Sequence, residues 1–151
     1  MTKSTILVTG GAGYIGSHAV LALLECGKNV TVLDDLSAGP PVAKFERVNF
    51  IEGNVGDGNL VANVIKEHNI GAIIHFAGSI RVDESVREPE KYFKNNAENT
   101  QILAEVAKKA DVKHFIYSSS AAVYGNPGRV PAREDDPTRP ISSPCCTWAP
   151  A

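Results

Sequence analysis

The chain has 151 residues, of which 43% are hydrophobic and 21% charged, and its formal net charge is −2. This composition is typical of one globular domain, and the lack of a basic block argues against a nucleic-acid partner. No apolar run reaches the ~18 residues that span a bilayer, and three cysteines make no disulfide framework. We therefore expect a protein of the reducing cytoplasm with no membrane partner.

Short β-branched runs alternate with segments of helical periodicity. The predicted strands are TILVTG (5–10), NVTVLDD (29–35), RVNFIEGN (47–54), GAIIHFAG (71–78) and VKHFIYSSS (112–120), and the predicted helices are 14–26, 60–68 and 90–110. This alternation predicts an α/β fold with a doubly wound, Rossmann-like parallel sheet. Five strands are fewer than a full domain of this kind usually has, so we expect the sheet to be incomplete at its C-terminal end. From residue 121 onward the chain reads as a proline-containing loop.

Several side chains of these elements are expected in the core. The last predicted helix has one apolar stripe, made of Phe93, Ala97, Ile102, Leu103, Val106 and Ala107. His75, inside an apolar strand, and Cys26, near the end of the first helix, are interpreted as buried packing residues. Gly27 is expected to end the first helix.

A glycine-rich segment, VTGGAGYIGSH (8–18), joins the first strand to the first helix. Gly11, Gly13 and Gly16 fit the pattern G-x-G-x-x-G. Starting from Gly10 instead, the pattern is G-x-x-G-x-x-G. The first glycine of such a loop makes the tight turn, the middle one lets backbone N–H groups approach a pyrophosphate, and the last packs helix against strand. The helix that follows directs the positive end of its dipole at the phosphates.

Asp34 ends the second predicted strand. A carboxylate at this position accepts hydrogen bonds from the hydroxyls of an adenosine ribose and repels a 2′-phosphate, and no Arg or Lys lies beside it. The loop and this carboxylate together predict NAD, rather than NADP, as the cofactor.

Other motifs accompany the loop. They are HFAG (75–78), the pair Asn95–Asn96 and SSSAAVYG (118–125). With TGGAGYIGSH they resemble the extended short-chain dehydrogenase/reductases, and most of all the UDP-glucose 4-epimerases, from Ile6 to about Pro144. The resemblance implies that bound NAD takes a hydride from C4 of a UDP-sugar and returns it to the other face, with a tyrosine as the base. It also implies a homodimer, in which residues 90–110 supply one of two interface helices.

The resemblance implies a set of cofactor residues at matching positions. They are Gly10, Gly13, Tyr14, Ile15 and Gly16 near the pyrophosphate, Asp34, Asp35, Leu36, Ser37, Ala38 and Gly39 near the ribose, Asn54 and Val55 at the adenine, and Phe76, Ala77, Gly78 and Asn95 along the cofactor. Asn54 replaces the family's Asp, and its amide oxygen is expected to accept from the adenine amino group. Ile80 stands where close relatives have a lysine. Ser120 is implied as the catalytic serine that contacts the sugar, and Tyr124 as a second substrate contact.

The family's Tyr-x-x-x-Lys pair, whose spacing puts both groups on one helical face, has no counterpart in this sequence. Four positions after its tyrosines, at 14, 92, 117 and 124, stand His, Asn, Ala and Gly. Counted from Ser120, the tyrosine would fall at Cys145 and the lysine at Ala149. We therefore expect an NAD-binding part over residues 1–141, a divergent tail over 142–151, no substrate lobe and an incomplete dimer interface. Such a chain is expected to be inactive, as a gene fragment or a frameshifted product would be.

Three kinds of function are compatible with these residues. The first is a truncated UDP-glucose 4-epimerase or another sugar-nucleotide epimerase or dehydratase. Ser120–Ala121 disfavours the 4,6-dehydratases, which usually have an Asp-Glu pair there. The second is a non-catalytic NAD-binding module, and the third is a structural domain without a ligand. No metal site is predicted, because Cys145 and Cys146 lack a second pair of ligands.

Overall fold

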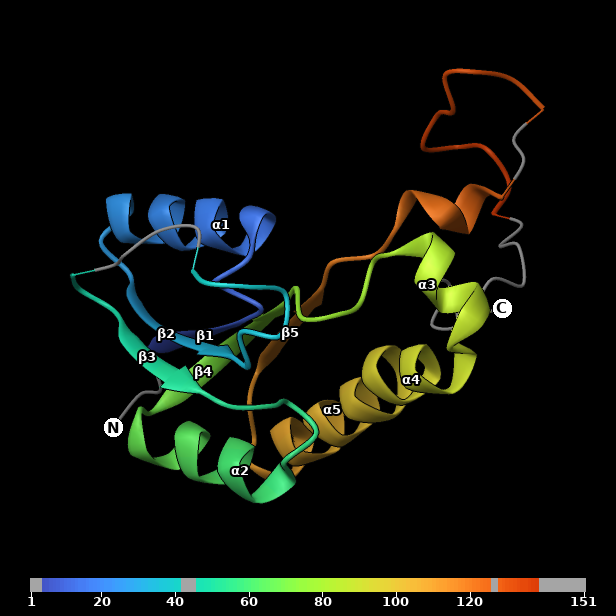
Figure 1. Ribbon diagram of the computed structural model, residues 1–151. Coiled ribbons are helices and arrows are strands. Elements are labelled where there is room, and N and C mark those ends of the chain that lie inside the picture. Colours follow the sequence, from blue (N-terminus) through green and yellow to red (C-terminus); the bar gives the residue numbers. More distant parts are fainter. Residues whose placement is uncertain (1–3, 42–45, 126–127, 139–151) are drawn as a thin grey trace. The chain divides into compact units, whose positions relative to one another are not determined.

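The computed structural model describes residues 4–41, 46–125 and 128–138 (Figure 1). The chain divides into two compact units. The first unit comprises Met1–Gly78 and Asn99–Ser118, and the second comprises Ser79–Glu98 and Ser119–Ala151. The predicted boundary between a binding part and a tail, at residue 141, lies outside the described residues.

A parallel sheet forms the first unit. Its strands are β1 (Thr5–Thr9), β2 (Asn29–Asp34), β3 (Asn49–Glu52), β4 (Ile70–His75) and β5 (His114–Tyr117), in the spatial order β3-β2-β1-β4-β5. Every neighbouring pair is parallel. The chain runs outward from β1 to β3 and then continues on the other side of β1, which makes the gap between β1 and β4 the topological switch point. The predicted fold class is confirmed.

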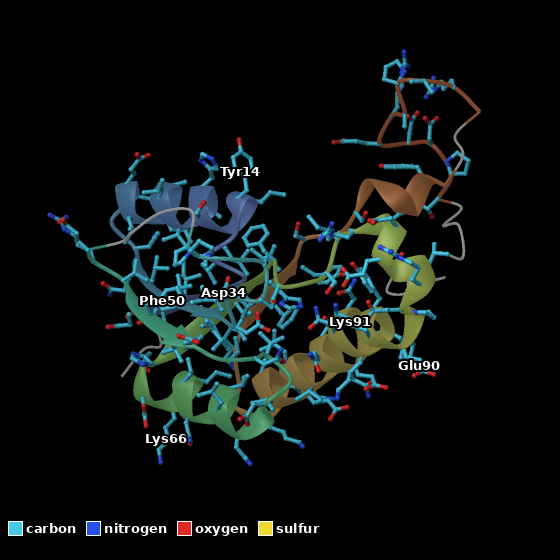
Figure 2. All side chains as sticks on the ribbon, in the orientation of Figure 1. Tyr14, Asp34, Phe50, Lys66, Glu90 and Lys91 are labelled. Carbon is cyan, nitrogen blue, oxygen red and sulfur yellow. The ribbon has the colours of Figure 1, made fainter. Side chains whose placement is uncertain are left out.

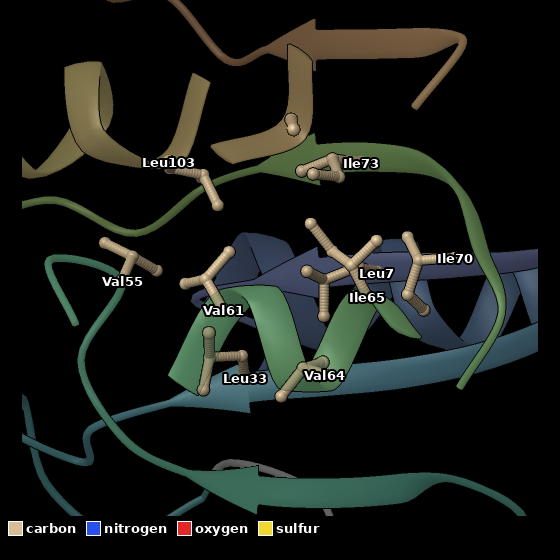
Figure 3. Close-up of a cluster of buried hydrophobic side chains, with 10 residues drawn as sticks. Leu7, Leu33, Val55, Val61, Val64, Ile65, Ile70, Ile73 and Leu103 are labelled. Carbon is tan, nitrogen blue, oxygen red and sulfur yellow. The ribbon is translucent and has the colours of Figure 1, made fainter. Parts of the chain in front are cut away.

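Helices cover both faces of this sheet (Figure 1). The helix α1 (Tyr14–Glu25) lies on one face, and α2 (Gly58–Glu67) and α5 (Asn99–Lys109) lie on the other. Neighbouring strand residues alternate between the faces, as the pleat requires. Leu7 belongs to the cluster that contains Val61 and Leu103 (Figure 3), whereas Val8 packs with Val20 of α1. The two clusters form the core on either side of the sheet.

The end of α1 is closed by a Schellman motif, as Gly27 predicted. The N–H of Gly27, at φ 70°, donates to the carbonyl of Leu24, and the N–H of Lys28 donates to that of Leu23. The prediction that Cys26 is buried is wrong, because Cys26 is exposed. It is the C-cap residue, past the last turn of α1 that packs on the sheet.

The segment 90–110, predicted as one helix, consists of three successive pieces. These are α4 (Pro89–Phe93), the π-helix η1 (Lys94–Glu98) and α5. Within η1 the repeat is one residue longer than in an α-helix, so the inward-facing position before Ala97 lies five residues back instead of four. Tyr92 is accordingly fully buried, whereas Phe93, the predicted core residue, is 49% exposed. Leu103 and Ala107 are buried as predicted.

The second unit contains α3 (Val82–Arg87), α4, η1 and the 3₁₀ turn η2 (Ala121–Tyr124). Neither α3 nor η2 was predicted. The hydroxyl of the buried Tyr92 donates to a carboxylate oxygen of Glu84 at 2.9 Å and accepts the backbone N–H of Arg81 at 3.2 Å. Tyr92 therefore fixes the start of α3 against α4.

Among the described residues, none of the helices combines the length and the apolar character that crossing a bilayer requires. The same part of the chain contains no cluster of His, Cys, Asp and Glu side chains able to hold a metal ion. Cys145 and Cys146 lie outside it.

Candidate functional site

The glycine-rich loop between β1 and α1 is a close-packed backbone turn at the carboxyl edge of the sheet. A Cβ added at Gly10, which has φ 70°, would lie 2.5 Å from the backbone nitrogen of Ala77, and one added at Gly16 would lie 2.1 Å from the carbonyl oxygen of Gly10. At Gly13 the added atom would meet only that same oxygen, at an ordinary 3.5 Å. Protein packing thus requires glycine at positions 10 and 16 but leaves room beside Gly13, where the fingerprint places a pyrophosphate.

The N-terminus of α1 lies beside this space and has no side-chain cap. Gly13 is the N-cap residue and offers no side-chain acceptor to the first N–H groups of the helix. Tyr14 and Ile15, the first two helical residues, are 71% and 63% exposed, and Figure 2 shows Tyr14 at the open start of α1. Uncapped N–H groups and the positive end of the helix dipole form a site for a phosphate group.

Asp34, at the end of β2 (Figure 2), joins the glycine loop to the segment that follows β2. Its Oδ2 accepts the backbone N–H of Ala12, and its Oδ1 accepts that of Leu36, both at 2.9 Å. A carboxylate has about four lone-pair positions, so each oxygen keeps one for a further donor. This is the geometry expected of an acceptor for ribose hydroxyls beside a bound pyrophosphate.

Residues 35–39 form a tight turn beyond Asp34. Oδ1 of Asp35 accepts from the backbone N–H and the hydroxyl of Ser37, at 3.0 and 2.5 Å. Burial raises the pKa of Asp35, but the hydrogen bonds from Ser37 and Asn54 outweigh it and hold the pKa below its usual value. Leu36 has φ 55° and Gly39 has φ 124°, and the N–H of Gly39 donates to the carbonyl of Leu36. Ala38 is an exposed residue inside this turn.

Asn54 follows β3, and its side-chain amide makes three hydrogen bonds. Its Nδ2 donates to Oδ2 of Asp35 at 2.8 Å, while its Oδ1 accepts the backbone N–H of Gly56 at 2.8 Å and Nδ2 of Asn99 at 3.0 Å. Both lone pairs of the amide oxygen are thus engaged, so the expectation that this oxygen accepts from an adenine amino group does not hold here. Val55 is 5% exposed and belongs to the core cluster, and its assignment to the adenine stays a prediction.

The segment after β4 lies against the glycine loop. The N–H of Phe76 donates to the carbonyl of Thr9 at 2.9 Å, and Ala77 supplies the atoms closest to a Cβ at Gly10. Gly78, the last residue of this part of the first unit, follows directly. Phe76, Ala77 and Gly78 therefore lie at the carboxyl edge of the sheet, where the sequence predicted them.

His75, the last residue of β4, is 1% exposed, which confirms its prediction as a core residue. Its ring nitrogens are hydrogen-bonded to two hydroxyls, Nδ1 to Thr9 at 2.6 Å and Nε2 to Thr100 at 2.8 Å. Burial lowers the pKa of His75 to about 4. A neutral imidazole thus ties β1, just before the glycine loop, to β4 and α5.

Three predicted site residues belong to the second unit. Nδ2 of Asn95, in the π-helix, donates to the hydroxyl of Ser79 at 2.8 Å, and its neighbour Asn96 pairs with the backbone N–H and carbonyl of the same serine. The carbonyl of Ser120 accepts the N–H of Val123 and so begins η2, in which Tyr124 is half-buried. The positions counted for the tyrosine and lysine, Cys145 and Ala149, lie outside the described residues.

Two residues of the first unit were missed at the sequence level. Asn99 and Thr100, at the start of α5, are 7% and 2% exposed, and they hold Asn54 and His75 respectively. A signal for Asn99 was available, because the apolar stripe through Leu103 and Ala107 continues back to position 99 at a helical spacing of four. A polar side chain at such a core position must have a buried partner.

A parallel sheet with an uncapped helix and a glycine turn at its switch point, and a carboxylate at the end of the adjacent strand, defines a dinucleotide-binding unit of the Rossmann class. Residues 6–147 match the model of the NAD dependent epimerase/dehydratase family. The chain belongs to this family.

Curated relatives and solved structures agree with this assignment. The chain is 47% identical over 137 residues to a UDP-glucose 4-epimerase of Azospirillum brasilense, a match that covers 91% of the chain and 39% of that relative. Solved UDP-glucose 4-epimerases from Brucella ovis, in complex with NAD, and Bifidobacterium longum, in complex with NAD+ and UDP, superpose with TM-scores of 0.87 and 0.88. They are 38% and 41% identical and are matched over 95% of this chain but only 44% and 45% of theirs. The chain thus spans about two fifths of the length of such relatives.

Proposed function

We propose that this chain is the N-terminal, NAD-binding part of a UDP-glucose 4-epimerase-like enzyme. The observation that carries the proposal is the unfilled space beside Gly13, in front of the uncapped start of α1. When bound, NAD supplies the hydride acceptor for oxidation at C4 of a UDP-sugar. The chain's own residues bind and orient it: the N–H groups at Tyr14 and Ile15 meet the pyrophosphate, and Asp34 accepts from the ribose hydroxyls.

The same carboxylate selects NAD over NADP. Asp34 is fixed in place by Ala12 and Leu36, so it has no freedom to swing away from an incoming 2′-phosphate. An anion there would be repelled by Asp34 and by its neighbour Asp35, whose hydrogen bonds favour the ionised form. Phe76, Ala77 and Gly78 line the path of the dinucleotide past β4, and Asn95 is proposed to face it as well.

The chain as given is proposed to lack epimerase turnover. Ser120 and Tyr124 are assigned to the sugar of a UDP-sugar substrate, but the 151 residues contain no Tyr-x-x-x-Lys pair to accept and return the proton. Loss of a general base alone slows such a step by about 10²–10⁴-fold. We propose that the whole enzyme, at the length of these relatives, contains the base, the sugar-binding part and the rest of a homodimer interface. We propose that it is a cytoplasmic enzyme of galactose metabolism.

A second candidate is a non-catalytic NAD-binding module. The absence of the Tyr-x-x-x-Lys pair favours it. Both candidates predict NAD binding without turnover by the 151-residue chain, and they differ when the base is restored. In the first, a chain extended with an epimerase C-terminal part, including Tyr and Lys at positions 145 and 149, interconverts UDP-glucose and UDP-galactose. In the second, it does not.

The test of the binding proposal is calorimetric titration of the chain with NAD, together with the variant Gly13→Ala. Position 13 has φ −73°, which alanine adopts freely, and the new methyl group meets only one protein atom at 3.5 Å. Its effect on the fold is therefore limited to a weaker N-cap, below about 1 kcal/mol. The same methyl group displaces the pyrophosphate from one or more N–H groups, and a charge-assisted hydrogen bond contributes about 1.5–3 kcal/mol.

We expect Gly13→Ala to bind NAD at least about tenfold more weakly with a nearly unchanged melting temperature. The matched control is Gly128→Ala, where an added Cβ meets nothing within 4 Å and where we expect unchanged affinity. Equal NAD affinity of the wild-type chain and Gly13→Ala, or no binding by the wild-type chain at millimolar NAD, would contradict the proposal.

A further inference from the structure

Thr9, the last residue of β1, is where the chain enters the glycine-rich turn. The carbonyl of Thr9 accepts the N–H of Phe76 at 2.9 Å, and the N–H of Gly10 donates to the carbonyl of Leu33 at 3.0 Å. The carbonyl of Gly10 in turn accepts the N–H of Gly13 at 3.3 Å. A group that holds Thr9 therefore acts directly on the peptide that begins the turn.

The side chain of Thr9 is fully buried and belongs to a chain of three polar groups. Its Oγ1 lies 2.6 Å from Nδ1 of His75, and Nε2 of His75 lies 2.8 Å from Oγ1 of Thr100 in α5. Thr9 and His75 are opposite each other in the pairing of β1 with β4. Three buried side chains, from β1, β4 and α5, are thus hydrogen-bonded in series next to the start of the turn.

The direction of these two hydrogen bonds follows from a count of donors and acceptors. Burial keeps the imidazole neutral at pH 7, so one ring nitrogen carries a hydrogen and the other accepts one. Among the residues that the structure describes, the partner of the Thr9 hydroxyl is Nδ1, so a hydrogen on Nδ1 would leave the hydroxyl hydrogen buried without an acceptor. Thr9 therefore donates to Nδ1, and Nε2 carries the hydrogen that Thr100 accepts. The hydroxyl of Thr100 keeps its own hydrogen, which a helical threonine commonly donates to a carbonyl of the preceding turn.

Given the NAD site proposed above, on which this inference rests, we propose that His75 is a positioning residue of that site. It holds Thr9, and with it the glycine-rich turn, in the conformation that receives a pyrophosphate. It acts through the hydroxyl of Thr9 on one side and is anchored to α5 by Thr100 on the other. A turn without this connection has more conformations to lose when a ligand orders it, and that ordering weakens binding. Such a role depends on the hydroxyl of Thr9 and not on the shape of its side chain.

The experiment separates the hydroxyl of Thr9 from its shape. Thr9→Val keeps the branched shape and removes the hydroxyl, whereas Thr9→Ser keeps the hydroxyl and removes a methyl group. The matched control is Thr31→Val, a change to another fully buried threonine of the same sheet, whose hydroxyl has no hydrogen-bond partner among the described residues. The dissociation constant for NAD is measured by calorimetry for each 151-residue chain, at a temperature where circular dichroism shows that chain to be folded.

We expect Thr9→Val to bind NAD about tenfold more weakly, the value of one hydrogen bond, and Thr9→Ser and Thr31→Val to stay within about threefold of the wild-type chain. Both changes at Thr9 should lower the melting temperature, because valine leaves Nδ1 of His75 unpaired and serine leaves a gap in the core. A loss of stability alone therefore does not account for the difference in affinity. Thr100→Val, which removes the anchor in α5, should weaken NAD binding several-fold and covers the case in which Thr9→Val does not fold.

Nitrogen NMR of the ligand-free chain gives a second readout, which should show the hydrogen of the His75 ring on Nε2. A hydrogen on Nδ1 would overturn the inference. Equal NAD affinity of the wild-type chain, Thr9→Val and Thr100→Val would overturn the positioning role and leave the NAD site standing, as would equal losses in Thr9→Val and Thr9→Ser. If the wild-type chain does not bind NAD, the proposed function itself fails, and the positioning role fails with it.

Discussion

The buried His75 makes the first unit sensitive to acid, and the size of the effect follows from its surroundings. The imidazole is 1% exposed, its two ring nitrogens contact Thr9 and Thr100, and the rings of Phe115 and Tyr117 lie 6.2 and 5.7 Å away. Burial lowers the pKa of His75 from 6.5 to about 4, and it raises the pKa of Tyr117, which stays neutral in this range. No carboxylate is among these contacts to stabilise an imidazolium ion.

The sign of the pH dependence is fixed by proton binding. Between pH 6.5 and about 4 the unfolded chain binds a proton at His75 and the folded chain does not, so lowering the pH favours unfolding. At 1.36 kcal/mol per pKa unit, the native state loses about 2 kcal/mol between pH 7.5 and pH 5 from this residue alone. This window lies above the range in which carboxylates take up most of their protons.

The assay is urea unfolding at pH 7.5 and pH 5.0 for the wild-type chain and His75→Gln. Glutamine keeps one donor and one acceptor for the two threonines and does not titrate, while every other histidine is the same in both proteins. We expect the variant to be less stable at pH 7.5, through imperfect packing, but to lose about 2 kcal/mol less than wild type on acidification. Parallel losses in the two proteins would refute the reasoning, as would an imidazole NMR titration of His75 with a midpoint near 6.5.

Two further changes test how the backbone of the first unit is held. Gly16→Ala should lower the free energy of unfolding by about 1–3 kcal/mol, measured by urea unfolding. The reason is that the new Cβ would lie 2.1 Å from the backbone carbonyl oxygen of Gly10, so the backbone would have to shift. A melting temperature as high as that of Gly13→Ala would contradict this. Asp57→Ala should cost about 1 kcal/mol by the same assay, since its carboxylate accepts the N–H groups of Asn59 and Leu60 as the N-cap of α2. Asp83→Ala, which removes an exposed ion pair with Arg87 and one of two acidic residues in the first turn of α3, serves as its control and should change stability by less than about 0.5 kcal/mol.

The sheet and its glycine loop follow from local sequence signals. The central strands β1, β2 and β4 are mainly buried and read as short β-branched runs, as parallel strands do, and the edge strands β3 and β5 are largely exposed. All five strands were predicted to within three residues of their observed bounds. The conformation of Gly27 and the tight turn at Gly10 follow in the same way, because only glycine adopts a positive φ at no steric cost. The position of Asp34 at the end of β2 was also predictable, because a single acidic residue at this strand end is typical of dinucleotide-binding folds.

Features that depend on contacts across the chain were not predictable in this way. The π-helix η1 changes the register of the segment before Ala97, so a strict period of 3.6 assigns Phe93 to the core in place of Tyr92. No local residue preference marks such an insertion. It coincides with Asn95 and Asn96, both of which bond to Ser79, a residue well before them in the chain.

The orientation of Asn54 is the same kind of case at the level of one side chain. Sequence alone places an amide side chain after β3, and an amide offers both an acceptor and a donor. Which of the two faces outward depends on Asp35 and Asn99, one from the turn after β2 and one from the start of α5. Which group Asn54 presents to its surroundings is therefore a property of the folded network and not of the residue type.

The network around Asp34 indicates that the proposed cofactor site is organised before a cofactor binds. The hydrogen bonds from Ala12 and Leu36 hold the carboxylate in one position and hold the glycine loop to β2. Side-chain ordering on binding costs about 0.5–1.5 kcal/mol for a flexible group, and a carboxylate already fixed by two backbone donors avoids most of that cost. Because the same carboxylate also holds the loop, its replacement by alanine would loosen the pyrophosphate end as well as the ribose end. In the proposed site the two ends are thus coupled through one residue, and we expect a fragment such as adenosine monophosphate to lose affinity on that change along with the whole dinucleotide.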